Sequence, residues 1–210
     1  MNIAEYAEQL FNLAYSQEMI DFITSLGGTS SDEWLMKVTA IRGYYFFVFY
    51  KSTSQFFIVG YMRRGNNTTD FVYINLNNAF ILSQHLLSRF RKRIIADGIK
   101  YDLRGRMFDI LEHSIQTLIN INEEIYLCNT GISDKYNDNY FAWTKFGLIP
   151  VIRYSDIVFC GTTFISVDML NEKQKELWDS VHSKLLEQDL LRGNRAVSYT
   201  HLRAHETLSD

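Results

Sequence analysis

The run Tyr44-Tyr-Phe-Phe-Val-Phe-Tyr50, which four polar residues separate from Gln55-Phe-Phe-Ile-Val-Gly-Tyr-Met62, decides the fold. Aromatic and β-branched residues favour extended strands. The interruption Ser52-Thr-Ser54 is typical of a turn, as is Arg42-Gly43 ahead of the run. We therefore predict antiparallel strands over residues 34–50 and 55–62, which a further turn and a strand at 71–76 extend into a meander of about four strands.

Helical spacing frames this meander. Apolar residues before and after it recur at three- and four-residue steps, which is the period of an amphipathic helix. The predicted helices cover residues 3–26 (one helix or a broken pair), 84–97, 105–120, 139–146 (short, ended by Gly147) and 172–191. The predicted later strands cover residues 124–128, 148–154 and 156–167. This order of elements indicates an α+β fold.

The composition is that of a globular chain. Of its 210 residues, 47% are hydrophobic and 21% charged, which is enough to bury a real core. No low-complexity linker interrupts the sequence, so we expect a single domain over residues 1–195. No apolar run reaches the roughly 18 residues that a membrane span requires, and the N-terminus lacks a signal-peptide pattern. We therefore expect a cytoplasmic protein without membrane contact.

Residues 196–210 form a separate case. The stretch Ala196-Val-Ser-Tyr-Thr-His-Leu-Arg-Ala-His-Glu-Thr207 resembles the translated reading frame of a sequencing-library adapter. We expect a non-native tail there, in which the histidines have no functional meaning. The remaining histidines are scattered, and Cys128 and Cys160 lie in apolar runs that are typical of small buried hydrophobes. Neither a metal site nor a disulfide is expected.

Basic residues concentrate between His85 and Arg106. This window holds seven Lys or Arg and two acidic residues, in a chain whose net charge is −3. The cations of residues 89–93 have two interpretations, a solvated helix face or a surface for an acidic partner. Arg104 and Arg106 fall in the predicted first turn of a helix, where cations oppose the helix dipole, so an anionic ligand would explain them. The negative net charge argues against an extended nucleic-acid surface.

Two segments carry a resemblance to a known family. Lys100-Tyr-Asp-Leu103-Arg-Gly105 and, later, Trp143-Thr-Lys-Phe-Gly147-Leu148 resemble motifs of the GNAT superfamily of N-acetyltransferases. The later segment, which Asn139-Tyr140-Phe141 precedes, resembles in particular a phage-associated GNAT-like group. The family's glycine-containing turn binds the pyrophosphate of acetyl-CoA. Lys100 keeps the basic first position of that turn and Gly105 keeps its last glycine. Leu103 stands where the other glycine is expected.

The resemblance implies a mixed, mainly antiparallel central sheet flanked by helices, with acetyl-CoA as cofactor. It implies that an acetyl group passes to an amine of a small molecule or protein, and that the strands near Asn75 and Cys128 lie side by side and splay apart. A tyrosine often protonates the departing thiolate in this family, and Tyr140 is the candidate. Trp143 occupies the place where many members carry that tyrosine, and an indole has no acidic hydroxyl. The implied cofactor-binding residues are Lys100, Leu103, Arg104, Gly105 and Arg106.

A second hypothesis belongs to a different functional class. On it, the chain is a non-catalytic GNAT-like binding module of a phage or mobile element, and the basic helix at residues 89–93 binds a nucleic acid or an acidic partner. Leu103 and Trp143 favour this hypothesis, whereas Gly105 with its flanking arginines favours the acyltransferase. The two departures from the family pattern make binding the stronger expectation than turnover.

Overall fold

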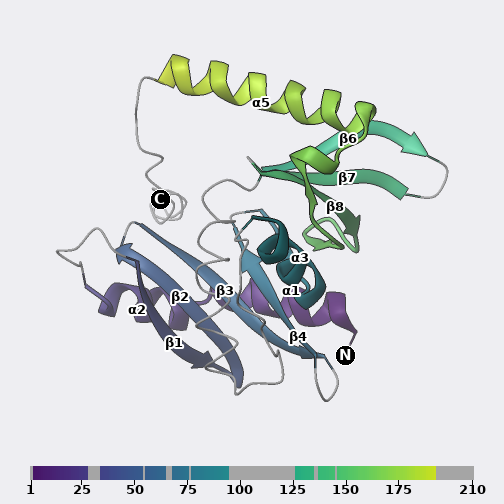
Figure 1. The fold of residues 1–210 in the computed structure, drawn as a ribbon. Coiled ribbons are helices and arrows are strands. Elements are labelled where there is room, and N and C mark those ends of the chain that lie inside the picture. The colour runs from purple at the N-terminus through teal and green to yellow at the C-terminus, as the bar shows by residue number, and fades with distance from the viewer. Residues whose placement is uncertain are drawn as a thin grey trace, which may run out of the picture.

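The computed structural model of the chain describes residues 2–27, 34–53, 55–64, 68–75, 77–94, 126–134, 137–144 and 146–192. The helix predicted over residues 105–120 and the tail from residue 196 lie outside them. The elements in these ranges form an α+β fold around one mixed, mainly antiparallel sheet, as predicted (Figure 1).

Two short helices open the chain, α1 (Ile3–Ala14) and α2 (Gln17–Ser25). Asn2 caps α1, because its Oδ1 accepts a hydrogen bond from the Glu5 backbone N–H at 2.8 Å while the Glu5 carboxylate accepts one from the Asn2 N–H at 3.0 Å. Ser16 caps α2 by a single bond, with its Oγ accepting from the Met19 N–H. The second cap separates the two helices, so of the predicted alternatives the broken pair is confirmed.

The predicted meander is confirmed and gains a fifth strand. Each strand pairs antiparallel with the next. Positive φ angles of 49° at Arg42 and 85° at Gly43 suit the tight two-residue turn between the first two strands. The five strands are β1 (Leu35–Ile41), β2 (Tyr44–Ser52), β3 (Gln55–Arg64), β4 (Thr68–Ile74) and β5 (Ala79–Leu82).

The second half of the chain extends the same sheet. Its strands are β6 (Tyr126–Asp134), β7 (Asn137–Thr144), β8 (Gly147–Arg153), β9 (Val158–Gly161) and the short β10 (Ile165–Ser166), which pairs with β8. The sheet order is β1-β2-β3-β4-β5-β9-β8-β7-β6. The two halves meet where β5 runs parallel to β9.

The short helix predicted over residues 139–146 is wrong, because this segment is strand β7. β7 pairs with β6 on one side and β8 on the other, so its backbone hydrogen bonds are made by the sheet. Phe141 and Trp143 pack in one cluster with Leu148. Ala142, which lies between them in the sequence, belongs to the core on the other face. Period-two burial of this kind is typical of a strand.

The central strands of the sheet are buried on both faces. Phe47 and Phe49 of β2 point into one core, whereas Phe46 and Val48 point into the other. This explains why β2 reads as a continuous apolar run. Helix α1 packs on the second of these faces, and α3 (Gln84–Ile94) packs on the first (Figure 1).

The last described helix, α5 (Glu172–Arg192), lies across β6 and β7 (Figure 1). Leu177, Trp178 and Val181 of α5 pack against the cluster of Phe141, Trp143 and Leu148. The predicted helices at residues 84–97 and 172–191 are thus confirmed over their described parts. Within the described ranges, no helix combines the length and apolar character needed to cross a bilayer.

Gly147 is required by a close backbone contact rather than by a helix end. It begins β8 opposite Ser166 of β10. A Cβ atom placed on Gly147 would lie 2.0 Å from the carbonyl oxygen of Ile165, and its φ of +154° is rarely adopted by other residues. The glycine that was predicted to end a helix therefore lets β10 approach β8.

We predict that Gly147→Ala lowers the free energy of unfolding by more than about 3 kcal/mol, since the backbone of β10 must move away. Gly43→Ala is the matched control, because Gly43 also has a positive φ but no atom within 4 Å of the added Cβ. We expect a loss of about 1–2 kcal/mol there. Urea denaturation followed by circular dichroism measures both. Equal losses would show that the approach of β10 imposes no constraint.

Candidate functional site

The cofactor residues predicted from the resemblance lie outside the described part of the chain. These are Lys100, Leu103, Arg104, Gly105 and Arg106. Tyr140, the predicted acid, lies in β7 between Asn129 of β6 and Val151 of β8, and its side chain also lies outside the described part. The predicted acetyl-CoA site therefore stays a prediction.

The strands near Asn75 and Cys128 are not neighbours, contrary to the expectation from the resemblance. Asn75 follows β4, and Cys128 lies in β6. In the sheet, β5, β9, β8 and β7 lie between these two strands. The reason is that the chain returns to β5 through β9, so β6 is placed far from the meander.

The segment after β4 has a structural role instead. The Asn75 Oδ1 accepts hydrogen bonds from the backbone N–H groups of Asn77 at 3.1 Å and Asn78 at 3.0 Å, which shapes the turn into β5. The Tyr15 hydroxyl donates to the Asn75 carbonyl at 2.8 Å. Partial burial raises the pKa of Tyr15 to about 12, so this phenol remains a donor at neutral pH.

Trp143 binds α5 to the sheet. Its Nε1 donates to the backbone carbonyl of Trp178 at 3.2 Å, and the Trp178 Nε1 donates to the carbonyl of Thr144 at 2.9 Å. The two indoles stack with ring centroids 5.8 Å apart, and His182 stacks on Trp178 at 4.9 Å. Trp143 is 3% exposed. Trp143, which the resemblance would put in the place of a tyrosine, thus has a packing role.

The start of the basic helix α3 is fixed by two strands. The fully buried Asp70 of β4 accepts a hydrogen bond from the Gln84 N–H through Oδ1 at 3.1 Å. The Ser83 hydroxyl accepts from the Leu86 N–H at 3.1 Å and donates to the Gly161 carbonyl of β9 at 3.3 Å. A carboxylate at a helix N-terminus also stabilises the helix dipole. Asp70 therefore anchors the start of α3.

One side of α3 is packed into the core. Leu86, Leu87 and Phe90 are at most 5% exposed. The Phe90 ring meets Phe164 at 4.9 Å and Phe146 at 5.8 Å, both edge to face. Burial of these side chains fixes which side of the helix is presented to solvent.

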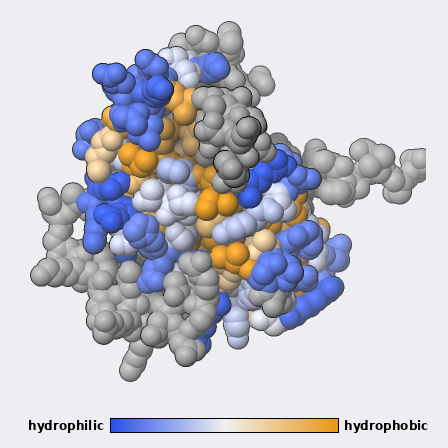
Figure 2. Space-filling view, turned by 90° about the vertical axis from the view of Figure 1, so that its right-hand side faces the viewer, coloured by the Kyte–Doolittle hydropathy of each residue, from blue (hydrophilic) through white to orange (hydrophobic). Residues whose placement is uncertain are grey.

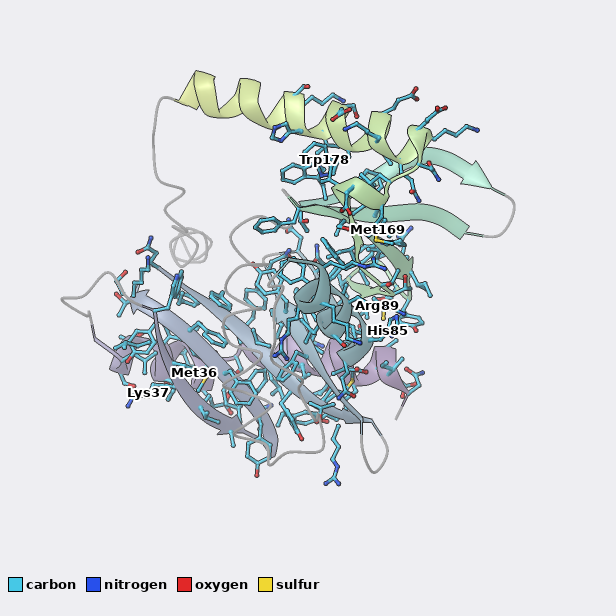
Figure 3. The ribbon with its side chains drawn as sticks, in the orientation of Figure 1. Met36, Lys37, His85, Arg89, Met169 and Trp178 are labelled. Atoms are coloured by element: carbon cyan, nitrogen blue, oxygen red, sulfur yellow. The ribbon has the colours of Figure 1, made fainter. Side chains whose placement is uncertain are left out.

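The opposite side of α3 presents an exposed basic stripe, which consists of His85, Arg89 and Lys92. These residues are spaced i, i+4 and i+7, so they lie in a row along the helix. Figure 3 shows His85 and Arg89 close together on α3, on the other side of the molecule from Lys37. In the described part of the chain, neither Arg89 nor Lys92 forms an ion pair.

The other arginines of the cluster are used differently. Arg91 and Arg93 are partly buried, and an Arg93 guanidinium N–H donates to the backbone carbonyl of Phe164. The three cations of the last turn, which are Arg91, Lys92 and Arg93, also interact favourably with the negative end of the helix dipole, by about 0.3–1 kcal/mol each. The basic run predicted as one face thus divides into exposed cations, Arg89 and Lys92, and two partly buried arginines, of which Arg93 is anchored to Phe164.

Around this helix, the described residues show no metal site. The described residues contain no group of three or more His, Cys, Asp or Glu side chains placed to hold a metal ion. The Cys160 side chain is buried, as predicted for a small hydrophobe. Comparison of the chain with protein-family models, with curated proteins and with solved structures finds no match to any of the three.

We predict that Trp178→Phe lowers the free energy of unfolding by about 2–3 kcal/mol, because Thr144 loses its indole donor and the ring stack shrinks. Trp34→Phe is the control. The Trp34 Nε1 is buried and has no hydrogen-bond partner among the described residues, so the same loss of volume removes no hydrogen bond. The difference between the two variants, measured by chemical denaturation, should be at least about 1 kcal/mol. If the two variants lose the same free energy of unfolding, the hydrogen bond of the Trp178 indole does not hold α5 on the sheet.

Proposed function

We propose that this chain is a binding module and that the exposed basic stripe of α3 holds an acidic segment of a protein partner. The observation that carries this proposal is the row of His85, Arg89 and Lys92 on a helix whose other side is packed into the core. A helix fixed in this way presents its cations at constant spacing. Little conformational entropy is then lost when a partner binds.

The chemistry of the stripe favours carboxylates. The sequence of α3, from Gln84 to Ile94, contains no acidic residue, so an approaching carboxylate meets no repulsion from the helix itself. Arg89 offers a planar set of donors that matches a carboxylate. Lys92 adds a second charge one turn further along. A partner with acidic residues at helical or extended spacing can contact both.

The extent of the stripe favours a protein partner over a nucleic acid. From His85 to Lys92 the helix rises by roughly 10 Å, which spans few phosphates. Duplex-binding surfaces typically neutralise about 6–10 phosphates, whereas the stripe has two permanent cations. The net charge of −3 adds repulsion toward a polyanion.

A second candidate is the acetyl-CoA-dependent N-acyltransferase implied by the resemblance. The observation that favours it is the mixed, mainly antiparallel sheet with helices on its faces, which is the architecture that the resemblance implies. On this candidate, Lys100, Arg104 and Arg106 neutralise the pyrophosphate of the cofactor. The separation of β4 from β6 and the packing role of Trp143 make it the weaker of the two.

The binding proposal predicts that Arg89→Glu with Lys92→Glu weakens binding of a fluorescein-labelled octaglutamate peptide at least tenfold at 50 mM salt. A tenfold loss is about 1.4 kcal/mol, as expected when two charge-assisted contacts become repulsive. Fluorescence anisotropy measures the affinity. Raising the salt to 300 mM should weaken binding by the unmodified chain, since exposed charges are screened.

The matched control is Lys37→Glu with Lys184→Glu, which changes the net charge equally at exposed positions away from the stripe. We expect less than a twofold effect. If this pair weakens binding as much as the stripe variants do, overall charge rather than the stripe is responsible. Tighter binding of a 20-base-pair DNA duplex than of the peptide would show that the partner class is wrong.

The acyltransferase candidate predicts that CoA binds the chain and that Arg104→Ala weakens this binding at least tenfold, or by about 1.4 kcal/mol. Isothermal titration calorimetry measures both. Arg89→Ala is the control, because the stripe has no role in binding CoA on this candidate. An absence of heat on titration with CoA would exclude the enzyme and leave the binding module standing.

A further inference from the structure

A cleft of about 660 Å³ lies beside the C-terminal end of α3. Its walls come from four places in the sequence, three of which are Arg93 of α3, the segment that includes Ser166 and Leu170, and Lys175 in the first turn of α5. Phe146, between β7 and β8, adds an aromatic wall. The cleft is open to solvent over much of its surface, so a ligand bound there stays partly in contact with water.

The cleft combines an apolar wall with two cations. Phe146, Val167 and Leu170 supply the apolar surface, and Arg93 and Lys175 supply the positive charges. Asp168 of the 3₁₀ turn η1 (Val167–Met169) also lines the cleft. The lining therefore has one net positive charge, which suits a monoanion better than a dianion. Figure 2 shows a side of the molecule on which apolar residues are exposed between hydrophilic ones.

The two cations differ in how firmly they are held. Arg93 donates to the Phe164 carbonyl, and Phe164 is fully buried, so the guanidinium is oriented before any ligand arrives. Its remaining N–H groups are enough for a carboxylate. Lys175 is half exposed, and its Nζ lies 3.9 Å from the Asp179 carboxylate. A contact at that distance between exposed groups is weak, so Lys175 can turn toward a ligand in the cleft.

The aromatic wall is also fixed. The Phe146 ring packs edge to face on Phe90 at 5.8 Å. The Phe146 N–H donates to the Thr144 Oγ at 3.2 Å, and its carbonyl accepts from the Val167 N–H at 3.1 Å. The bond from Val167 joins the two sides of the apolar surface, so the wall is largely formed in advance.

We propose that this cleft binds a small organic monoanion, namely a carboxylate with an apolar body, and that it is a site separate from the stripe of α3. The carboxylate lies between Arg93 and Lys175, and the apolar body lies against Phe146 and Leu170. Charge-assisted hydrogen bonds orient the ligand, and burial of its hydrocarbon supplies the affinity.

Octanoate is the probe, and 1-octanol is its uncharged counterpart. We expect octanoate to bind the full-length chain saturably with one molecule per chain, and octanol to bind at least about fivefold more weakly. Methyl NMR shifts of Val167 and Leu170 report the location, and calorimetry reports the affinity. Lys175→Gln removes the charge but keeps a side chain of similar reach, and should weaken octanoate about fivefold without changing the affinity for octanol.

Lys184→Gln on the same helix is the matched control and should leave both affinities unchanged. Equal binding of octanoate and octanol would overturn the role of the cations. Saturable binding that shifts methyl groups elsewhere but not those of Val167 and Leu170 would overturn the assignment to this cleft. No saturable binding of octanoate would overturn the proposal as a whole. The octaglutamate assay with the Arg89 and Lys92 variants is independent of all these outcomes.

Discussion

The parallel pairing of β5 with β9 is the contact on which the rest of the structure depends. Four residues of each strand pair in register, from Ala79 with Val158 to Leu82 with Gly161, and all eight are buried. Parallel neighbours require a long crossover connection, and here that connection begins with α3. The same junction fixes the start of α3, because Ser83 bonds to Gly161 as soon as β5 ends. The direction of the exposed stripe and the position of the cleft therefore follow from this pairing.

The meander and the helices α3 and α5 could be predicted from the sequence because their patterns are local. Aromatic and β-branched runs separated by turn residues define β1 to β4, and apolar spacing defines α3. The pairing of β5 with β9 could not be predicted in this way, because Ala79–Leu82 is only four residues long and its partner lies almost eighty residues later. The helix predicted over residues 139–146 is wrong because aromatic side chains in so short a segment fit the helical period and the strand period equally well. The neighbours in the sheet, β6 and β8, decided in favour of a strand.

The candidate site was predictable to a similar degree. Helical spacing alone places His85, Arg89 and Lys92 on one side of a helix. Arg93 differs from these residues because it donates a hydrogen bond to the carbonyl of Phe164, 71 residues away. No local sequence pattern predicts such a contact. The sequence context of Gly147 predicts only that it ends a secondary-structure element. A glycine is needed at this position because the carbonyl of Ile165 lies where a Cβ atom would be. This contact is known only once β10 is placed in the sheet. Long-range contacts thus account for most of what the sequence left open.

The reciprocal bonds between Trp143 and Trp178 have a consequence for the order in which the chain is completed. Trp143, Phe141 and Leu148 leave the ribosome well before the residues of α5 that cover them. Until about thirty further residues have been added, these large apolar side chains lack their cover, and exposed apolar strand surface favours aggregation. Synthesis of α5 therefore marks the point at which this end of the sheet is protected. A nascent chain that pauses before Trp178 would expose Phe141, Trp143 and Leu148, which are side chains of the kind that chaperones bind.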